Sequence, residues 1–340
     1  MPFACFGIID VQIVKGPKMN NRRQFMIVAG ASLLLPGSVI AQQNRPARIG
    51  ILGSSPGPHW DTFTQELRRL GYESGKNIEF DFRWVEGRNE RLATFAAELV
   101  SRKMDVIVTE GTLASVTAKK NTDTIPIVMA ISADPVGAGL VSSLAHPGGN
   151  VTGSSSLAPN LIAKQFELLR EIIPGMTRLA ILSNPDHPLA KLTHAQAETA
   201  ARALRVQLVL LSARGRADYY ESFQNAIKGR AGGMLILADP TFDTEQNFLA
   251  EFALKNKLPT LYNKTAFADA GGLIAYGARY SEFFARAAIF VNKILKGAKP
   301  SDLPIEQATN FELVVNMNTA KALGLKIPQA ILVRADKVIE

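Results

Sequence analysis

Cysteine is almost absent from this sequence, since Cys5 is the only one among 340 residues. Cys5 precedes the apolar segment near the N-terminus, so a chain that begins after that segment carries no thiol. Such a chain needs no particular redox compartment. Two-lobed racemases that use paired cysteines are excluded. The chain also has only four histidines, whose spacing does not suit a metal, and we expect them at surface or turn positions.

Catalytic motifs are also missing. The sequence has no G-x-G-x-x-G after a predicted strand, no G-x-x-x-x-G-K-[ST] and no H-E-x-x-H. The segment "GSSSL" (153–157) fails the G-x-S-x-G pattern because Leu157 replaces the second glycine. We therefore expect a protein that is not an enzyme and that holds no cofactor and no metal, with a two-lobed enzyme as the weaker alternative.

The positive charge is moderate and dispersed. The whole chain carries a formal net charge of +8. Removing residues 1–41 takes away Lys15, Lys18, Arg22, Arg23 and Asp10, a net +3, and leaves +5. The remaining basic residues form no arginine-rich arm and no helix-turn-helix pattern. Nucleic acid is therefore not an expected partner, and the charge favours solubility or mild attraction of anions.

Residues 1–41 read as an export segment rather than as part of the fold. The stretch that starts at Met19, "MNNRRQFMIVAGASLLLPGSVIAQQ", has a basic start, an apolar centre and a Val39-x-Ala41 end. That order predicts a signal peptide cleaved after Ala41 and a soluble periplasmic protein. An uncleaved membrane anchor is the alternative, although the apolar run is short for a span. The general and twin-arginine routes both stay open, and residues 1–18 suggest a start codon assigned too far upstream.

Two stretches far apart in the sequence look alike, "ARIGILGSSPGPHW" (47–60) and "TRLAILSNPDHPLA" (177–190). Each opens a series in which short apolar runs rich in β-branched residues alternate with amphipathic segments. That alternation indicates βαβ units and a parallel sheet. We therefore predict an α/β fold of two Rossmann-like parallel-sheet lobes; one large sheet is the alternative.

The boundaries between the lobes follow from composition. The Gly- and Ser-rich "AHPGGNVTGSSS" (145–156) is typical of a crossover. The C-terminal part is too short for a third domain, so we expect it to complete both lobes. Lobe 1 is predicted as residues 46–151 and 277–304, and lobe 2 as residues 152–276 and 305–335. The chain would cross near Asn150–Gly153, near Tyr276 and near Leu303–Glu306.

From Arg48 to about Glu340 the chain resembles periplasmic substrate-binding proteins of ABC transporters, in the branch related to tryptophan-binding and other aromatic amino-acid-binding components. The most specific stretch is "DPVGAGLVSSLAHPGGNVTG" (134–153), and "GGLIAYG" and "KILKGAKPSDLPIEQATNFELVVNMNTAKALGL" also resemble the branch. The resemblance implies a type I periplasmic binding protein fold with three crossovers, no catalysis and an ABC permease as partner. We expect a monomer that captures a small carboxylate-bearing ligand by hinge closure. Gly148, Gly149 and Gly153 are the expected hinge residues.

The carboxyl ends of the two strand sets meet at one crevice, where ligands bind in open α/β sheets. The turns that follow the strands supply the candidate ligand-binding residues: Ser54, Ser55, Gly111, Thr112, Ser132, Asp134, Asn184, Asp239, Tyr262 and Tyr276. For each Ser, Thr, Asn or Asp the alternative is simple capping of the following helix.

The predicted roles at this crevice are specific. Gly111–Thr112 is the predicted carboxylate cradle, because glycine permits close approach of the backbone and threonine adds a hydroxyl. Asp134 either accepts from a ligand ammonium or caps a helix predicted over residues 135–144. Tyr262 and Tyr276 either stack on an apolar part of the ligand or are buried structural residues.

Two other readings concern the role of the chain. A binding protein that signals to a membrane receptor, instead of feeding a permease, would have the same sequence features. A transcriptional regulator of similar lobed fold is disfavoured, because an export segment stands where its DNA-binding domain would be. The sequence leaves the identity of the ligand open, since specificity depends on side chains in the cleft.

Overall fold

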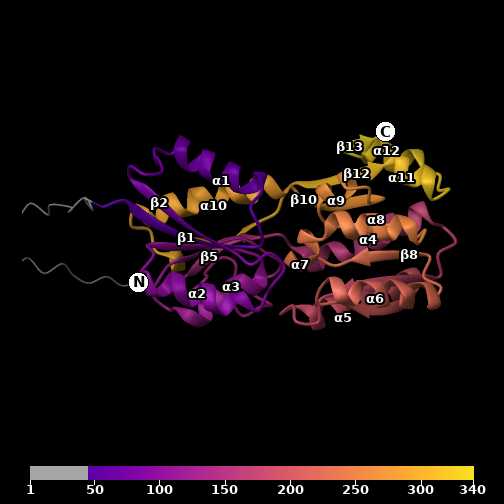
Figure 1. Ribbon diagram of the computed structural model, residues 1–340, viewed down its shortest axis with the longest axis horizontal. Helices are drawn as coiled ribbons and strands as arrows, with labels where there is room; N and C mark the ends of the chain where they lie inside the picture. Colours follow the sequence, from indigo (N-terminus) through magenta and orange to yellow (C-terminus); the bar gives the residue numbers. More distant parts are fainter. Residues whose placement is uncertain (1–44) are drawn as a thin grey trace, which may run out of the picture. The chain divides into compact units, whose positions relative to one another are not determined.

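The computed structural model describes residues 45–340. The predicted export segment, residues 1–41, lies outside the described residues. The segment Arg45–Glu340 forms a unit of its own, and within it the strands divide between two sheets (Figure 1).

The first sheet has six strands in the order β11-β5-β4-β3-β1-β2, and every pair is parallel. Its strands are β1 (Ala47–Gly53), β2 (Ile78–Trp84), β3 (Val106–Glu110), β4 (Ile127–Ser132), β5 (Val151–Ser155) and β11 (Glu306–Gln307). The central strands β3, β4 and β5 are buried along their whole length, as expected for parallel strands covered on both faces.

Helices cover both faces of this sheet. They are α1 (Pro58–Arg69), α2 (Arg91–Ser101), α3 (Thr112–Asn121) and α10 (Tyr280–Leu295). One apolar core joins α1 and α10 to the sheet, and a second joins α2 and α3 to its other face. Although α10 comes late in the sequence, it lies with the first lobe (Figure 1).

The second sheet has seven strands in the order β13-β12-β10-β9-β8-β6-β7. They are β6 (Arg178–Ser183), β7 (Gln207–Ser212), β8 (Gly233–Ile236), β9 (Thr260–Tyr262), β10 (Ile274–Ala278), β12 (Phe311–Asn316) and β13 (Lys337–Ile339). Only the β10–β12 pair is antiparallel among the described strands. The prediction of two α/β lobes with parallel-dominated sheets is confirmed.

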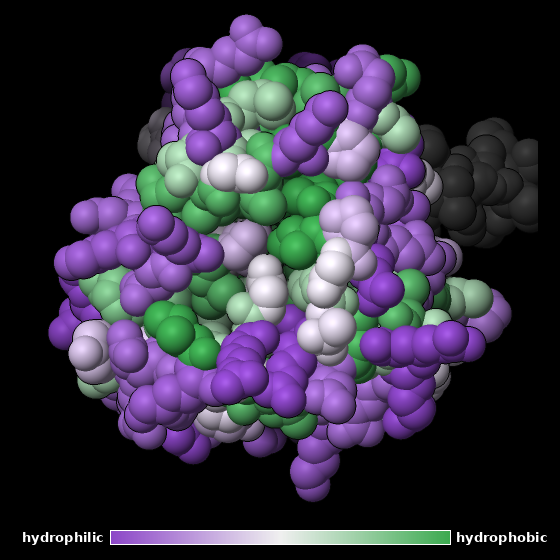
Figure 2. Space-filling model, turned by 90° about the vertical axis from the view of Figure 1, so that its right-hand side faces the viewer, coloured by the Kyte–Doolittle hydropathy of each residue, from purple (hydrophilic) through white to green (hydrophobic). Residues whose placement is uncertain are grey.

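The remaining helices pack against this second sheet. They are α4 (Ala158–Ile172), α5 (Ala190–Leu204), α6 (Arg216–Lys228), α7 (Pro240–Thr244), α8 (Gln246–Lys255), α9 (Thr265–Asp269), α11 (Met317–Ala322) and α12 (Gln329–Arg334); a 3-10 turn, η1 (Pro300–Asp302), precedes β11. One core includes α4 and α5, and another includes α6 and α8. The end of this lobe shown in Figure 2 is mainly hydrophilic, with apolar side chains gathered in the upper half of the view.

The chain changes sheet three times: after β5, after β10 and after β11. The first change comes after Ser155, because β5 pairs with β4 in the first sheet, whereas the sequence placed the boundary between residues 151 and 152. Gly153 therefore lies inside a buried strand and is not at the crossover where a hinge residue was expected. Its φ is +131°, and a Cβ there would lie 2.1 Å from the Met129 carbonyl oxygen.

The helix predicted over residues 135–144 is absent from the structure. The segment forms turns instead. Oδ1 of Asp134 accepts hydrogen bonds from the backbone N–H groups of Val136 and Gly137 at 3.1 and 2.9 Å. Glycines at 137 and 139 weaken a helix, and a side chain that binds the local backbone favours the turn over a helix.

Candidate functional site

A chamber lies where the carboxyl ends of the two sheets meet. We call it the inter-lobe chamber. Its lining residues are Ile131 near the end of β4, Gly111, Thr112, Ala133 and Ser156 just after strands of the first sheet, Tyr280 at the start of α10, and His187, Ala238, Asp239, Pro240, Asp243, Asn263 and Lys264 of the second lobe. The lobes also touch beside it, since Nδ2 of Asn89 donates to Oγ1 of Thr241 at 2.9 Å.

The first lobe contributes the start of α3 to this chamber. Gly111 has a φ of +93°, and a Cβ there would lie 2.9 Å from Cγ of Pro240, so this position favours glycine on two counts. Glycine has no side chain to cap α3. Behind it, Oγ1 of Thr112 accepts from the Ala133 N–H at 3.0 Å and lies 3.2 Å from Oγ of Ser132. The helix start is thus held rigidly, with its positive end toward the chamber.

The second lobe contributes a carboxylate, Asp239, that is only 4% exposed. Its Oδ1 caps α7 by accepting from the Thr241 N–H at 2.8 Å, and it also accepts from Nδ2 of Asn184 at 3.3 Å. Asp239 therefore both caps α7 and lines the chamber. Asp239 brings a buried negative charge to the chamber wall.

His187 lies beside this carboxylate. Its Nδ1 accepts from the Leu189 N–H at 3.2 Å. Burial lowers the pKa of His187, against the opposing effect of the Asp239 charge. A neutral ring whose Nδ1 accepts carries its proton on Nε2. His187 therefore offers one N–H donor to the chamber.

A buried ionic and aromatic cluster, which no sequence pattern predicts, adjoins the chamber and shares Asp243, Lys264 and Tyr280 with its lining. Its centre is Glu110, which is 2% exposed. Oε2 accepts from the Ser54 N–H at 3.0 Å and from the Ser54 hydroxyl at 2.7 Å, and Oε1 accepts from the Tyr280 hydroxyl at 2.8 Å. Burial alone would raise the pKa of Glu110, but nearby His59, the Lys264 charge and the Ser54 N–H outweigh burial and lower it to about 2.

The second lobe supplies the cation of this cluster. Nζ of Lys264 lies 2.6 Å from Oδ2 of Asp243 and 3.8 Å from the centre of the Tyr280 ring. The Tyr262 hydroxyl donates to the same Asp243 carboxylate. Burial raises the pKa of Asp243 despite the attraction of Lys264. The cluster therefore joins charged groups of both lobes across their boundary.

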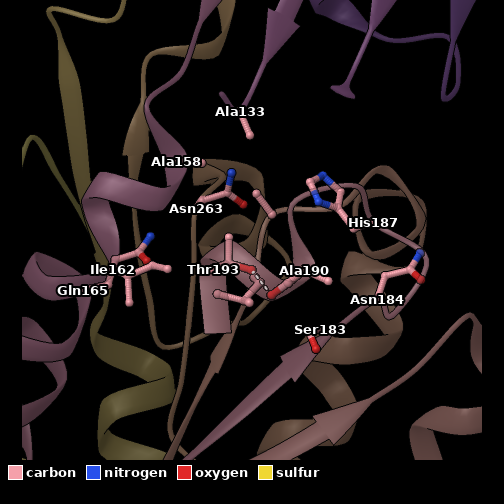
Figure 3. A pocket seen from close by; sticks show the side chains of 12 residues that line it. Ala133, Ala158, Ile162, Gln165, Ser183, Asn184, His187, Ala190, Thr193 and Asn263 are labelled. Carbon is pink, nitrogen blue, oxygen red and sulfur yellow. Dashed lines mark hydrogen bonds between the residues drawn. The ribbon is translucent and has the colours of Figure 1, made fainter. Parts of the chain in front are cut away.

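A second space, lined by no Asp, Glu, Lys or Arg, adjoins the chamber on the side of the second lobe, and we call it the side pocket (Figure 3). Its lining residues are Ala133, Ala158, Ile162, Gln165, Ser183, Asn184, His187, Ala190, Thr193, Leu237, Ala238 and Asn263. Only Ala133 comes from the first lobe. The two spaces share Ala133, His187, Ala238 and Asn263, so they are adjacent.

Residues 58–339 match the family described as "ABC transporter substrate binding protein". This chain belongs to that family. The curated relative "Tyrosine-binding protein" of Clostridioides difficile (strain R20291) is 26% identical over 264 residues, which cover 78% of this chain and 76% of that protein.

Two solved structures resemble this substrate-binding protein over 86% of its chain and 100% of their own, each with a TM-score of 0.80. One is a conserved domain protein from Vibrio cholerae with 30% sequence identity. The other is an ABC domain from Streptococcus pneumonia in complex with L-Trp, with 26% identity. More distant periplasmic binding proteins share the fold alone. The predicted family and the type I periplasmic binding protein fold are confirmed.

The structure distributes the predicted site residues of this substrate-binding protein over several places. Gly111, Thr112 and Asp239 line the inter-lobe chamber, and Asn184 lines the side pocket. Ser54 and Ser55 line a third cavity beside α1 and α9. These placements bring together residues from turns of both lobes.

Four other predicted residues lie outside these three cavities. Ser132 is fully buried behind Thr112, and Asp134 holds its own turn, which is the capping alternative in a non-helical form. Tyr262 is 1% exposed with its hydroxyl on Asp243. Tyr276 stacks on Phe311 beside the core of the second lobe. Both tyrosines therefore make the contacts expected of structural residues and not of residues that stack on a ligand.

Residues 45–340 of this substrate-binding protein contain no group of three or more His, Cys, Asp or Glu side chains placed to hold a metal ion. In the same part of the chain, no helix is both long enough and apolar enough to cross a bilayer.

Proposed function

We propose that this substrate-binding protein is the exported binding component of an ABC importer and that it binds an aromatic amino acid. One observation carries the proposal: the inter-lobe chamber, lined by Asp239, Asp243 and Lys264, adjoins the side pocket, whose lining includes no Asp, Glu, Lys or Arg. An amino acid has the same two ends. The Tyrosine-binding protein of Clostridioides difficile and the L-Trp complex from Streptococcus pneumonia support the aromatic class.

The main-chain end of the ligand lies in the inter-lobe chamber in this proposal. Its carboxylate meets the start of α3 at Gly111–Thr112, where the helix dipole and uncapped N–H groups favour an anion. The Nε2–H of His187 adds a donor from the opposite lobe. Both lobes then hold the same ligand group.

The ammonium group has two acceptors in this proposal. The first is the Asp239 carboxylate. The second is Oδ1 of Asn263, a buried oxygen without a hydrogen-bond partner among the described residues, on a side chain that lines both spaces. A buried acceptor left unpaired is costly, and a ligand ammonium would satisfy it. Asp134 was the sequence-based choice for this role, but its turn engages it elsewhere.

The first prediction tests this ligand orientation by calorimetric titration of the chain from Gln42 onward. L-tyrosine or L-tryptophan is expected to bind, and L-leucine to bind more weakly. 3-(4-Hydroxyphenyl)propionate and indole-3-propionate, which lack the ammonium, should bind at least about tenfold more weakly than the matching amino acid, because a charge-assisted hydrogen bond contributes roughly 1.5–3 kcal/mol.

Asp239→Asn should weaken binding of the amino acid by the same factor and leave the affinity for the ligand without ammonium unchanged. The reason is that the amide still caps α7 and only the charge is removed. Asp134→Asn is the matched control and should bind like the wild type. Equal losses for both ligands in Asp239→Asn would contradict a contact between Asp239 and the ammonium.

The second prediction concerns hinge closure, which we propose as the response to ligand. In the structure the lobes contact each other through Asn89–Thr241 and through Lys264 over the Tyr280 ring. Opening would break both contacts and separate the two walls of the ligand site, so ligand favours the closed form. Small-angle scattering should show a smaller radius of gyration with ligand than without. An unchanged radius at saturation, with an open free protein, would rule out closure.

Export and delivery to an inner-membrane permease complete the proposal. The export part rests on the signal-like residues 1–41, and the permease on membership of the family. Closure would present the permease with a surface that differs from that of the open protein.

A further inference from the structure

The side pocket carries a feature that goes beyond the aromatic class of the ligand. Gln165, on α4, lines this pocket although its side chain is only 4% exposed. A buried amide in a mainly apolar pocket needs hydrogen-bond partners. The hydrogen bonds that Gln165 makes, and those it leaves unmade, therefore indicate which chemical group of a ligand the pocket binds.

One end of this amide is already occupied. Nε2 of Gln165 donates to the Tyr276 carbonyl oxygen on β10 at 3.0 Å. That contact fixes which way the amide points, because the side-chain oxygen cannot donate to a carbonyl. Among residues 45–340 no donor is bonded to Oε1 of Gln165, so this oxygen is an acceptor with spare capacity on a residue that lines the pocket.

Thr193, a second polar residue of the side pocket, lies on α5 and also has only acceptor capacity to spare. Oγ1 of Thr193 donates to the carbonyl oxygens of Leu189, just before α5, and of Ala190, each at 3.0 Å. Figure 3 shows the contact with Ala190. The hydroxyl hydrogen of Thr193 is therefore used, and only its lone pairs remain. The α4–α5 side of the pocket thus presents acceptors between the apolar walls formed by Ile162 and Leu237.

We infer that the side pocket selects aromatic side chains that carry a hydrogen-bond donor, the phenol of tyrosine or the indole of tryptophan, over phenylalanine, with Oε1 of Gln165 as the discriminating acceptor. This inference rests on the proposed function and adds a specificity-determining residue to it. Phenylalanine would contact the apolar walls, but it would bury Oε1 of Gln165 without water and without a hydrogen-bond donor. Burying an unpaired acceptor costs more free energy than the loss of a neutral contact.

The ligand side of the test uses the wild-type chain. L-tyrosine is compared with 4-fluoro-L-phenylalanine, and L-tryptophan with 3-benzothienyl-L-alanine, since each second ligand keeps the ring size and lacks the donor. The donor-bearing ligand should bind roughly 10- to 100-fold more tightly in at least one pair, which also tells tyrosine from tryptophan as the ligand. Equal affinities in both pairs would overturn the inference even if the variant below fails to fold.

The protein side of the test uses Gln165→Met, which keeps the length of the side chain and removes the acceptor. The preference for the donor-bearing ligand should fall to about one, while affinity for the donor-free ligand stays level or improves. The matched control is Gln196→Met on α5, outside the side pocket, which should keep the wild-type preference. A uniform loss for all ligands in Gln165→Met would show a structural role and contradict discrimination. If no aromatic amino acid binds the wild type, the proposed function itself fails and this inference fails with it.

Discussion

Replacing Glu110 with alanine is expected to cost about 3–5 kcal/mol of unfolding free energy. The change removes the acceptor of the Ser54 N–H, the Ser54 hydroxyl and the Tyr280 hydroxyl, and it leaves a cavity. It also removes the buried negative charge near Lys264. Guanidinium unfolding followed by circular dichroism measures the loss.

The control for this variant is Glu73→Ala. The Glu73 side chain is 55% exposed and pairs only with Lys76 three residues on, so the change should be within about 1 kcal/mol. A similar small effect for Glu110→Ala would mean that the buried cluster adds little stability.

Glu110 also makes the stability of the folded protein depend on pH, and the direction follows from its lowered pKa. The pKa of Glu110 is about 2 in the folded protein, below its ordinary value of 4.5, so acid protonates the unfolded state first. The stabilisation from Glu110 is complete above pH 4.5 and is lost as the pH falls toward 2, by about 3 kcal/mol in total. Glu110→Gln, which cannot titrate, should lose less stability over that range than the wild type does.

Gly153→Ala is expected to destabilise the protein by more than about 3 kcal/mol or to prevent folding. A Cβ at this position would lie 2.1 Å from the carbonyl oxygen and 2.6 Å from the nitrogen of Met129, both of which are backbone atoms in the neighbouring strand β4. The backbone φ of +131° is also unfavourable for any residue other than glycine. Thermal unfolding measures the effect.

Gly175→Ala is the matched control. A Cβ there meets no heavy atom within 4 Å, and its φ lies outside the range that favours glycine. Alanine should be neutral or stabilise by up to about 1 kcal/mol. Equal melting temperatures for the two variants would show that β5 can move away from β4 at little cost.

The sequence predicts the architecture well because architecture follows from local pattern. The repeated strand-and-turn openings at 47–60 and 177–190 mark β1 and β6, and alternation with helices gives parallel sheets. The wrong predictions concern segments in which a glycine or a short polar side chain determines the backbone conformation. Gly153 looks like a hinge by composition, yet a tight approach of two strands requires it. The 135–144 segment looks helical, yet the Asp134 side chain binds the backbone of Val136 and Gly137 and favours turns.

The candidate site was predictable only in part. The rule that parallel strands end at a common edge places Gly111, Thr112, Asp239 and Asn184 near the two adjacent spaces. The rule says nothing about which residues of opposite lobes meet. Glu110 reads from sequence as the last residue of a strand, and Tyr280 lies 170 positions away from it. Both residues belong to the first lobe, so their pairing depends on the return of α10 to the first sheet after the whole second lobe has been made, which no local pattern encodes.

The late position of α10 has a consequence for the order of folding during synthesis. Phe283, Phe284 and Ala287 fill the same core as Phe63 and Val108, and the Tyr72 hydroxyl reaches Asn292 across 220 positions of the chain. A nascent chain on the ribosome therefore exposes part of the first apolar core until residues beyond 290 have emerged. N-terminal domains usually fold first as they are made. Here strands β6 to β9 of the second lobe are made before the first lobe can complete its core, so the second lobe's sheet can begin to form while the first lobe is still open.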